Sequence, residues 1–302
     1  MLIDAPCLLH RARHISATTE HPTGRLEFAG DSTGVVYGFL KQVKALQSRF
    51  QTRQVAFAFD GRGSKRQKVC KAYKANRKPK PRSCDSCSFN GNDPITQCKV
   101  CYQSDCQDAE AYGVFKEQCR ALREEHLPAL GHRNVFVEDG YEADDVLASL
   151  VKHSLREDDE AVIVSSDHDL YQLLSDRVSM WLPHKKELYR QIDFMDQYGI
   201  PPEMWPSAMA ISGCPGDGVA GVKGIGLKFT CRFLRGELKP TSIAHKAISA
   251  GFNAGVVEHN FPLVELPYPG CPVYRLRKDD CTAARWRAVC KQLGFDSLLG
   301  EL

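Results

Sequence analysis

The apolar positions of the first 180 residues follow two spacings in alternation. Short apolar runs with the length of a buried strand occur at residues 1–4, 55–59, 135–137 and 161–165. Apolar residues recur at helical spacing in residues 34–49, in residues 109–130 and again after residue 142. Strands that alternate with helices predict a parallel sheet joined by crossover connections. We therefore predict an α/β core, and we expect a ligand site beyond the carboxyl ends of its strands.

Acidic residues stand where these predicted strands end. Asp4, Asp60 and Asp167 each follow an apolar run, and Asp169 lies two residues after Asp167. If the chain stays extended there, Asp167 and Asp169 point to the same side. Carboxylates that meet at one sheet edge repel each other unless a cation lies between them, and oxygen ligands favour magnesium, manganese or calcium.

A second acidic group opens the helical pattern after residue 140. Glu142, Asp144 and Asp145 precede apolar residues at helical spacing, and Glu142 and Asp145 share one helix face. Three carboxylates also suit the positive end of the helix dipole. Taken alone, an acidic helix start is often only a cap, and Asp-x-Asp after a strand is often a turn. Their combination with the other strand-end acids favours a metal site.

A basic run follows Asp60 directly, over residues 62–82. The candidates for phosphate contacts are Arg62, Lys65, Arg66, Lys74 and Arg77. Tyr73 offers a stacking face for a base. Such a run is often just a solvated face, but its place beside an expected metal ligand favours a polyanionic substrate.

Thirteen cysteines are many for a reducing compartment, and five of them fall in one polar segment. These five are Cys84, Cys87, Cys98, Cys101 and Cys106. Two Cys-x-x-Cys pairs at this separation predict a structural tetrahedral zinc site, with Cys106 as a substitute fourth ligand. The segment has little apolar core of its own, so zinc would have to order it. The alternative is a flexible loop of free thiols.

A glycine-rich turn occurs in residues 211–229. Gly221, Gly224 and Gly226 lead into a predicted helix, and Lys223 and Lys228 stand beside them. Backbone N–H groups at such a turn can bind a phosphate of a nucleic-acid backbone.

Composition adds limits rather than a function. The 302 residues suffice for one large domain or two smaller ones, and a net charge of +3 says little about partners. The sequence has no apolar stretch of membrane-span length and begins Met-Leu-Ile-Asp, unlike a signal peptide. We expect a cytoplasmic protein of a bacterium or a phage-infected host, with no membrane partner.

Six motifs, taken in order, resemble the 5′ nuclease family. They are Leu2-Ile3-Asp4, Phe57-Ala58-Phe59-Asp60, Tyr73-Lys74-Ala75-Asn76-Arg77, Gly140-Tyr141-Glu142-Ala143-Asp144-Asp145, Ser166-Asp167-His168-Asp169-Leu170 and Gly221-Val222-Lys223-Gly224-Ile225-Gly226. The family includes the 5′–3′ exonuclease domain of bacterial DNA polymerase I, bacteriophage 5′ exonucleases and flap endonucleases. The likeness runs almost end to end.

The resemblance implies a PIN-like parallel-sheet nuclease core in residues 1–180. It implies a basic helical arch at 62–108. The cysteine segment at 84–106 departs from the family pattern, and we interpret it as an insertion that staples or lengthens this arch. Residues 181–302 would form a helical domain whose helix–hairpin–helix motif grips duplex DNA.

The resemblance also implies roles for individual residues. Asp4, Asp60, Glu142, Asp144 and Asp145 would hold one Mg²⁺ or Mn²⁺ ion, and Asp167, Asp169 and Asp217 a second. Two such ions about 4 Å apart would activate a water molecule and stabilise the leaving 3′ oxygen. Lys74 and Arg77 would steer and polarise the scissile phosphate together with Arg11, and the glycine turn would hold a potassium ion.

One motif departs from the family pattern. Where the family has Gly-Asp-x-x-Asp-Asn, this chain reads Gly213-Cys214-Pro215-Gly216-Asp217-Gly218. Cys214 stands in the place of an acid, and Gly218 replaces the asparagine. The second metal site is therefore expected to be weaker or to favour a softer ion, manganese or zinc.

The resulting hypothesis is a monomeric, metal-dependent 5′–3′ exonuclease or flap endonuclease in DNA replication or repair. Its substrates would be DNA with a 5′ flap, an overhang or a free 5′ end. Two alternatives stay open: a non-catalytic or weakly active DNA-structure-binding homologue, and a nuclease that removes RNA primers from RNA–DNA hybrids or, with zinc, processes RNA.

Overall fold

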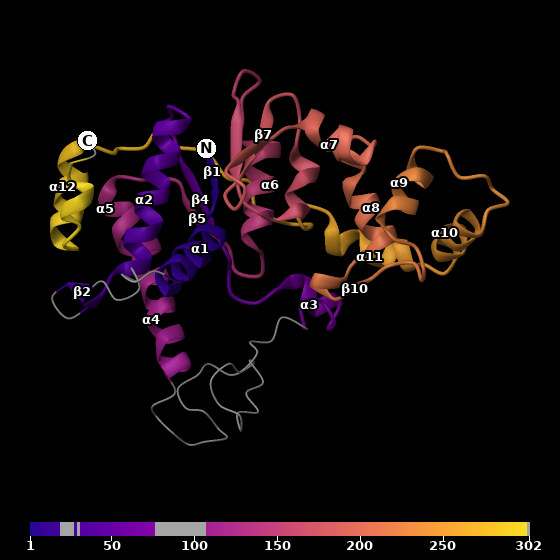
Figure 1. Ribbon diagram of the computed structural model, residues 1–302, viewed down its shortest axis with the longest axis horizontal. Helices are drawn as coiled ribbons and strands as arrows, with labels where there is room; N and C mark the ends of the chain where they lie inside the picture. The colour runs from indigo at the N-terminus through magenta and orange to yellow at the C-terminus, as the bar shows by residue number, and fades with distance from the viewer. Residues whose placement is uncertain (19–26, 29–30, 76–106, 301–302) are drawn as a thin grey trace. The chain divides into compact units, whose positions relative to one another are not determined.

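The structure, a computed structural model, describes residues 1–18, 27–28, 31–75 and 107–300 (Figure 1). Its contacts divide the chain into two compact units. Unit 1 contains the described residues of Met1–Pro6, Ala56–Asn76 and Phe136–Leu276. Unit 2 contains those of Cys7–Val55, Arg77–Val135 and Arg277–Leu302.

A six-stranded sheet forms the frame of unit 1. Its strands, in spatial order, are β5 (Val135–Val137), β4 (Ala56–Phe59), β1 (Leu2–Asp4), β6 (Ala161–Val164), β7 (Val178–Leu182) and β8 (Glu187–Tyr189). β1 pairs in parallel with β4 and β6, β6 pairs in parallel with β7, and β8 runs antiparallel. Every residue of β1 and β4 is buried, which explains their unbroken apolar runs. The predicted α/β class with a mostly parallel sheet is confirmed.

Helix α6 (Ala143–His153) packs against β1 and β4 (Figure 1). Its apolar residues Val146, Leu147 and Leu150 are fully buried, as their helical spacing predicts. A 3₁₀ helix over His168–Leu173 follows β6 and also contacts α6. These contacts fix the start of α6 near the strand ends.

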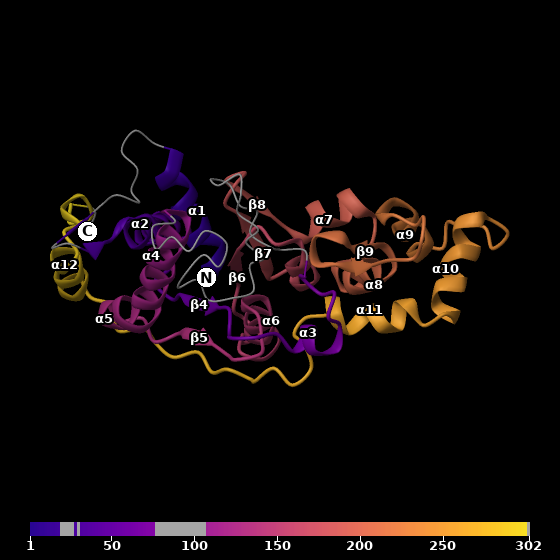
Figure 2. The same ribbon diagram turned by 90° about the horizontal axis from the view of Figure 1, so that it is seen from below.

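The remaining elements of unit 1 are mostly helical. They are α3 (Lys65–Val69), α7 (Gln191–Tyr198), α8 (Trp205–Ser212), β9 (Gly213–Cys214), β10 (Val219–Ala220), α9 (Leu227–Leu234), α10 (Ile243–Asn253) and α11 (Val256–Val264), with 3₁₀ turns at Pro202–Met204 and Pro215–Asp217. α8 packs against α9 and α11 (Figure 2). β9 and β10 pair as a short antiparallel hairpin between α8 and α9.

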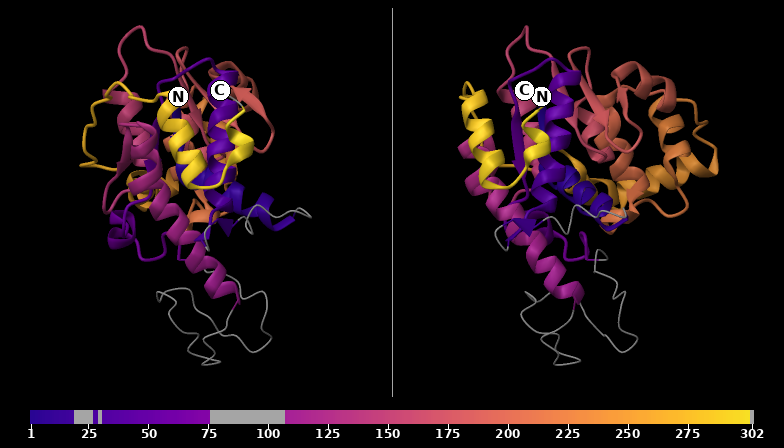
Figure 3. Two further views of the ribbon diagram at one scale, coloured as in Figure 1. Left: turned by 90° about the vertical axis from the view of Figure 1, so that its left-hand side faces the viewer. Right: turned by 60° about the vertical axis from the view of Figure 1, so that its left-hand side comes forward.

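Unit 2 is a group of helices. It contains most of α1 (Ala5–Thr18), α2 (Gly34–Arg49), α4 (Gln107–Ala121), a π-helical turn (Leu122–His126), α5 (Leu127–Leu130), α12 (Ala283–Gln292), a 3₁₀ turn (Asp296–Leu298) and the strand pair β2 (Glu27–Phe28) and β3 (Asp31–Ser32). Gln118 of α4 accepts a 2.8 Å hydrogen bond from the backbone N–H of Val35, at the start of α2. The C-terminal α12 packs against α5 (Figure 3).

The predicted elements are found with small changes. The helix expected over 109–130 consists of α4, the π-helical turn and α5. Each compact unit is made of three separate chain segments, whereas the predicted domains divide the chain once, near residue 180. The predicted nuclease and DNA-binding domains therefore stay a prediction. The predicted arch and its cysteine segment lie largely outside the described residues. Within those residues, no helix has the length and apolar character that crossing a membrane requires.

Candidate active site

Three predicted site acids stand at the same edge of the sheet, all within unit 1. β4, β1 and β6 are neighbours and parallel, so Asp60, Asp4 and Asp167 follow adjacent carboxyl ends. Asp4 is buried and accepts a 2.6 Å hydrogen bond from the Ser165 hydroxyl. Asp60 is exposed and accepts a 2.9 Å hydrogen bond from the backbone N–H of Ala143, the first residue of α6. This bond ties the acidic start of α6 to the strand ends.

Asp144 faces the strand-end acids from the start of α6. Burial raises the pKa of Asp144 well above its ordinary value, and the charges of Asp167, Asp4 and Asp169 raise it further, while Lys74 opposes them. The charges of three other carboxylates thus act on Asp144. This mutual repulsion is the electrostatic pattern expected of acids gathered for a cation.

Asp167 and Asp169 reach the cluster differently from the extended arrangement considered for them. The chain turns into the 3₁₀ helix directly after Asp167, whose carboxylate accepts a 3.0 Å hydrogen bond from the Asp169 backbone N–H. Trp205 donates a 2.8 Å hydrogen bond to the His168 carbonyl and so anchors this helix. Burial, followed by the charges of Asp167 and Asp217, raises the pKa of Asp169 to about 7. The 3₁₀ turn, rather than a strand, therefore brings Asp169 to the other acids.

Asp217 and Cys214 lie beside the same acids. Asp217 is buried, and its charge is one of those that raise the pKa of Asp169. Burial raises the pKa of the Cys214 thiol, and the charges of Asp169, Asp217 and Asp167 raise it further. The residue that replaces an acid in the family pattern is thus a protonated thiol among carboxylates.

The glycine that replaces asparagine has a packing reason. Gly218 has φ of 71°, and a Cβ atom there would lie 2.3 Å from the carbonyl oxygen of Ala72. A side chain cannot fit against backbone at that distance. Gly218 therefore lets the segment that carries Lys74 lie directly on the turn that carries Asp217.

Lys74 is held at the acid cluster through both its backbone and its side chain. Its backbone N–H donates a 2.7 Å hydrogen bond to the Asp217 carbonyl, and its ammonium lies 2.8 Å from Glu142 Oε2. The Tyr73 hydroxyl donates to the same oxygen at 3.0 Å. Lys74 has φ of 53°, a left-handed conformation that is uncommon for a residue with a side chain. The surrounding contacts impose this conformation and aim the ammonium at the carboxylates.

Burial argues against two of the predicted DNA contacts, which stay predictions. Arg66 and Tyr73 are each only 2% exposed. Arg66 donates to both oxygens of Asp145 at 2.7 and 2.8 Å and to the Leu263 carbonyl at 3.0 Å. In this arrangement the guanidinium of Arg66 is engaged by protein groups, and the Tyr73 hydroxyl donates to Glu142. The sequence of the basic run could not show which of its side chains point inward. Its one helix, α3, is only 5 residues long, which is too short for a helical spacing of apolar residues to be recognised.

Asp145 differs from the other acids of the predicted set. Its fully buried carboxylate accepts hydrogen bonds from Arg66, from the backbone N–H of Glu142 at 3.0 Å and from that of Tyr268 at 2.7 Å. These are the contacts of a structural anchor, which joins α3, α6 and the chain after α11. A metal role for Asp145 stays a prediction, and its hydrogen bonds favour a positioning role instead.

The other predicted contact residues are placed as follows. Arg62 is exposed and pairs with Asp139, and the Lys65 ammonium lies 2.5 Å from the Tyr141 hydroxyl. Lys223 and Lys228 are exposed at the turn that contains Gly221, Gly224 and Gly226, between β10 and α9. Arg11 is half-buried on α1, in unit 2, and its role stays a prediction. Arg77 and the five cysteines of the predicted zinc segment lie outside the described residues.

The acids have the charge and the ligand type of a cation site, but their carboxylate oxygens are too far apart to share an ion without moving. In the described part of the chain, no three of them form a group whose ligand atoms all lie within 4.8 Å of one another. Like charges in a buried place repel, so a cation would have to draw them together.

The family of the chain follows from comparison with known proteins. A family model described as the N-terminal resolvase-like domain of 5′–3′ exonucleases matches residues 1–199. The chain belongs to this family.

Relatives of this 5′–3′ exonuclease family member include bacterial polymerases. The thermostable DNA polymerase I of Thermus thermophilus is 31% identical over 286 residues, which are 90% of this chain and 30% of that protein. The DNA polymerase I of Mycobacterium leprae is 30% identical over 78% of this chain and 22% of its own length. The chain thus spans a third or less of these relatives.

Solved structures share the fold. The T5 5′-exonuclease with bound divalent zinc ions superposes with a TM-score of 0.66 and 22% identity, over 99% of this chain and 97% of that one. The catalytic core of Rad2 in complex with a DNA substrate gives 0.54 and 13%, over 97% and 86%. These structures support the PIN-like nuclease fold of the core.

Proposed function

We propose that this chain hydrolyses phosphodiester bonds near the 5′ ends of DNA, using two divalent cations held by the acid cluster. Family membership supplies the reaction class. The observation that carries the proposal is the convergence of acids from three neighbouring strand ends, the start of α6 and the turn at Asp217. Burial raises the pKa values of Asp144 and Asp169; the charges of Asp167, Asp4 and Asp169 raise that of Asp144 further, and those of Asp167 and Asp217 that of Asp169.

The donor set fits Mg²⁺ or Mn²⁺. Carboxylate oxygens are the ligands that these ions prefer. We assign Asp4, Asp60, Glu142 and Asp144 to one ion and Asp167, Asp169 and Asp217 to the other. Bound cations would supply an activated water molecule and would stabilise the charge of the leaving 3′ oxygen.

The protein's own part is to hold these ligands and to meet the phosphate. Ser165 donates to Asp4 and accepts from the backbone N–H of Asp167, so one hydroxyl orients two ligand-bearing segments. Lys74 stands within the cluster and can neutralise charge that develops on the phosphate. Arg77 and Arg11 are proposed to assist it.

The turn at Gly221–Gly226 is proposed to bind the duplex. Its exposed Lys223 and Lys228 can pair with phosphates, and backbone contacts of this kind do not depend on base sequence. We also propose the predicted K⁺ at this turn, a structural Zn²⁺ in the cysteine segment, and a monomer that acts in the cytoplasm. RNA–DNA hybrids stay a possible second substrate.

A second candidate function is a DNA-structure binder with little catalysis. Cys214 favours it, because a protonated thiol supplies the second site with one oxygen ligand fewer than the family pattern. The same thiol also favours Mn²⁺ or Zn²⁺ over Mg²⁺ if the chain is active.

The test is cleavage of a 5′-flap duplex as the concentrations of Mg²⁺ and Mn²⁺ are varied, with a chelator as control. Release of the flap with either ion supports the nuclease. A protein that binds the duplex but is inert with both ions is the DNA-structure binder. Matched flaps of DNA and RNA decide whether hybrids are cleaved.

Lys74 gives a sharper test of the mechanism. Lys74→Ala removes the ammonium, and we expect turnover to fall by roughly 10²-fold, in the range of one lost transition-state donor. Affinity for the flap duplex should change far less. An equal loss of turnover and affinity would show that Lys74 only binds DNA. Lys71→Ala is the matched control, because Lys71 is exposed in the same segment.

A further inference from the structure

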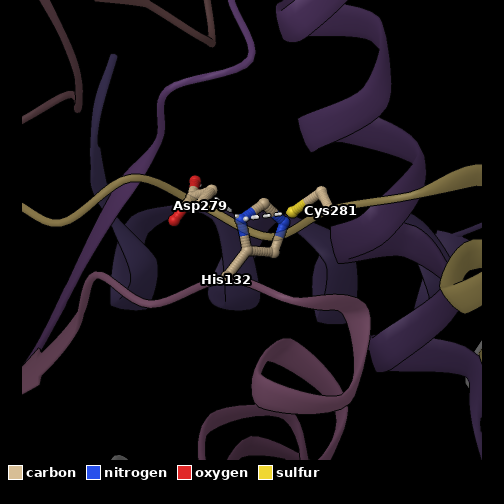
Figure 4. A group of neighbouring side chains, drawn as sticks. All are labelled: His132, Asp279 and Cys281. Carbon is tan, nitrogen blue, oxygen red and sulfur yellow. Dashed lines mark hydrogen bonds and ion pairs between the residues drawn. The ribbon is translucent and has the colours of Figure 1, made fainter.

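Unit 2 brings three metal-binding side chains together outside the acid cluster. His132 follows α5, and Asp279 and Cys281 lie in the segment before α12. One ligand atom from each lies within 4.8 Å of the other two. Figure 4 shows the imidazole between the carboxylate and the thiol. Among the described residues, this is the one such group of three or more.

Two of the three separations match those of a tetrahedral zinc site. His132 Nδ1 lies 3.3 Å from Asp279 Oδ2 and 3.5 Å from Cys281 Sγ. Zinc ligands at about 2.0 Å for nitrogen and oxygen and about 2.3 Å for sulfur lie about 3.3 Å (N to O) and about 3.5 Å (N to S) apart at the tetrahedral angle. A nitrogen–carboxylate hydrogen bond at 3.3 Å is long, since charge-assisted bonds lie near 2.7–2.9 Å. Without a metal these contacts are long hydrogen bonds, and the same spacing leaves room for a shared cation.

The carboxylate is already oriented by neighbours that a metal would not displace. Asp279 Oδ1 accepts hydrogen bonds from the Arg133 backbone N–H at 2.9 Å and from the Asn134 amide at 3.0 Å. Asp279 Oδ2 accepts from the backbone N–H of Val55 at 3.3 Å and keeps a second lone pair for a cation. Such outer contacts are typical of metal-binding carboxylates.

The backbone around the group is also fixed. Asp280 donates a 2.8 Å backbone hydrogen bond to Gly131, and a Cβ atom at Gly131 would lie 2.2 Å from the Asp280 carbonyl oxygen. Asn134 accepts from the backbone N–H of Arg277 at 2.8 Å. The two segments that carry the three side chains are thus held together on both sides of the group.

We propose that His132, Asp279 and Cys281 bind one Zn²⁺ ion through Nδ1, Oδ2 and Sγ. His132 is buried and Cys281 is exposed, so the fourth ligand is water on the solvent side. Nitrogen, sulfur and a single carboxylate are a zinc donor set, unlike the carboxylates of the active site. The ion clamps the segment 277–281 onto the turn 131–134, and it is separate from the zinc predicted for the cysteine segment.

The experiment measures zinc per chain by elemental analysis of the full-length protein, after incubation with Zn²⁺ and removal of unbound metal. The comparison is between the wild type and Cys281→Ala, whose exposed side chain makes a folding defect unexpected. Asp280→Asn is the matched control, because Asp280 is adjacent but pairs with Arg133 and Arg285. A variant with serine at all five cysteines of residues 84–106 removes the other predicted site.

We expect Cys281→Ala to bind one zinc fewer than the wild type, in both cysteine backgrounds, while Asp280→Asn binds as many. Titration should show that affinity for this equivalent falls by roughly 100-fold or more, since even outer contacts are worth 10–100-fold. Co²⁺ should give a thiolate charge-transfer band that Cys281→Ala lacks in the five-serine background. Equal zinc and equal Co²⁺ spectra in the two proteins would overturn the proposal and leave the group as hydrogen bonds alone.

Discussion

The acid cluster of unit 1 and the His132 group of unit 2 are opposite solutions to placing metal-binding side chains in a fold. In the acid cluster, burial and like charges raise the pKa values of Asp144 and Asp169. In the other group, burial tends to raise the pKa of Asp279, but hydrogen bonds from His132 and the Arg133 backbone lower it below its ordinary value. Without a cation, the carboxylates of the acid cluster repel one another, whereas the Asp279 carboxylate is already stabilised by hydrogen bonds. The conflict suits ions that must meet a substrate, and the satisfied group suits an ion that stabilises.

The largest expected effect separates the two regions by function. Asp144→Asn removes a proposed ligand, and we expect cleavage of a 5′-flap duplex to fall by about 10³-fold, as loss of several kcal/mol of transition-state stabilisation implies. The melting temperature should not fall, because one of several repelling carboxylates is neutralised. Zinc content should stay the same, whereas Cys281→Ala should lose zinc and keep cleavage. Loss of cleavage in both variants would contradict the separation.

The next effect contrasts two neighbouring acids within the active site. Asp145→Ala leaves the buried Arg66 without its partner, so we expect the free energy of unfolding to fall by about 3–5 kcal/mol. Denaturant unfolding of this variant beside Asp144→Asn measures the difference. The double variant Arg66→Met with Asp145→Leu should recover most of the lost stability, because both charges are gone. If Asp145→Ala is as stable as Asp144→Asn, Asp145 is not an anchor.

The raised pKa values give a pH dependence of stability. The pKa of Asp169 is about 7 in the folded protein against 3.8 ordinarily, so its protonated form favours the fold. This contribution is complete below pH 3.8 and is lost as pH rises through about 7. In a chelator, the melting temperature should therefore fall between pH 5 and pH 8, and Asp169→Asn should flatten the fall. Asp279 acts in the opposite sense but below this window, since its pKa is lowered from 3.8.

Added Mn²⁺ supplies the control for this pH effect. A cation favours the ionised carboxylates, so the fall in melting temperature should become smaller. A wild-type curve that rises from pH 5 to pH 8, or one that Asp169→Asn does not change, would contradict the effect.

The smallest expected effect concerns the one soft side chain among the hard ligands. Cys214→Asp restores an oxygen ligand, so we expect the rate with Mg²⁺ to rise relative to that with Mn²⁺ by roughly 3- to 10-fold, about 1 kcal/mol. Initial rates on the flap duplex at saturating metal measure this ratio. Cys70→Asp is the control, because Cys70 is half-buried like Cys214 but is not one of the proposed metal ligands. An unchanged ratio would mean that Cys214 lies outside the ligand set.

Local patterns in the sequence predict much of the active site. The strand-end acids and the start of α6 follow from spacing alone, whereas Asp217 is implied only by the family resemblance. In the structure the charges of Asp167, Asp4 and Asp169 act on Asp144, and those of Asp167 and Asp217 act on Asp169. The 3₁₀ turn after Asp167 is missed, because period-2 reasoning assumes an extended chain. The burial of Arg66 could not be predicted locally, because its partners, Asp145 and the carbonyls after residue 262, are distant in sequence.

The His132 group could not be predicted from spacing. His132 and Asp279 are 147 positions apart, and only the folded backbone of unit 2 brings them together. A pair of Cys-x-x-Cys motifs predicts a metal site because its ligands are close together in the chain. Single His, Asp and Cys residues that are far apart in the chain predict none. The need for glycine at position 218 could not be predicted either. It arises from the close approach of the Ala72 carbonyl oxygen, and Ala72 lies far away in sequence.

The hydrogen bonds around Arg66 and Asp145 also set an order of events during synthesis. The Asp145 carboxylate has all its hydrogen bonds only when the backbone N–H of Tyr268 donates to it, and the Arg66 guanidinium also donates to the carbonyls of Leu263 and Glu265. A chain still emerging from the ribosome has made every proposed metal ligand by residue 217 but lacks these partners for another fifty residues. The buried ion pair can therefore be completed only after residues 263–268 have been made, so the acids that it anchors would be held in place later than the synthesis of the proposed ligands themselves.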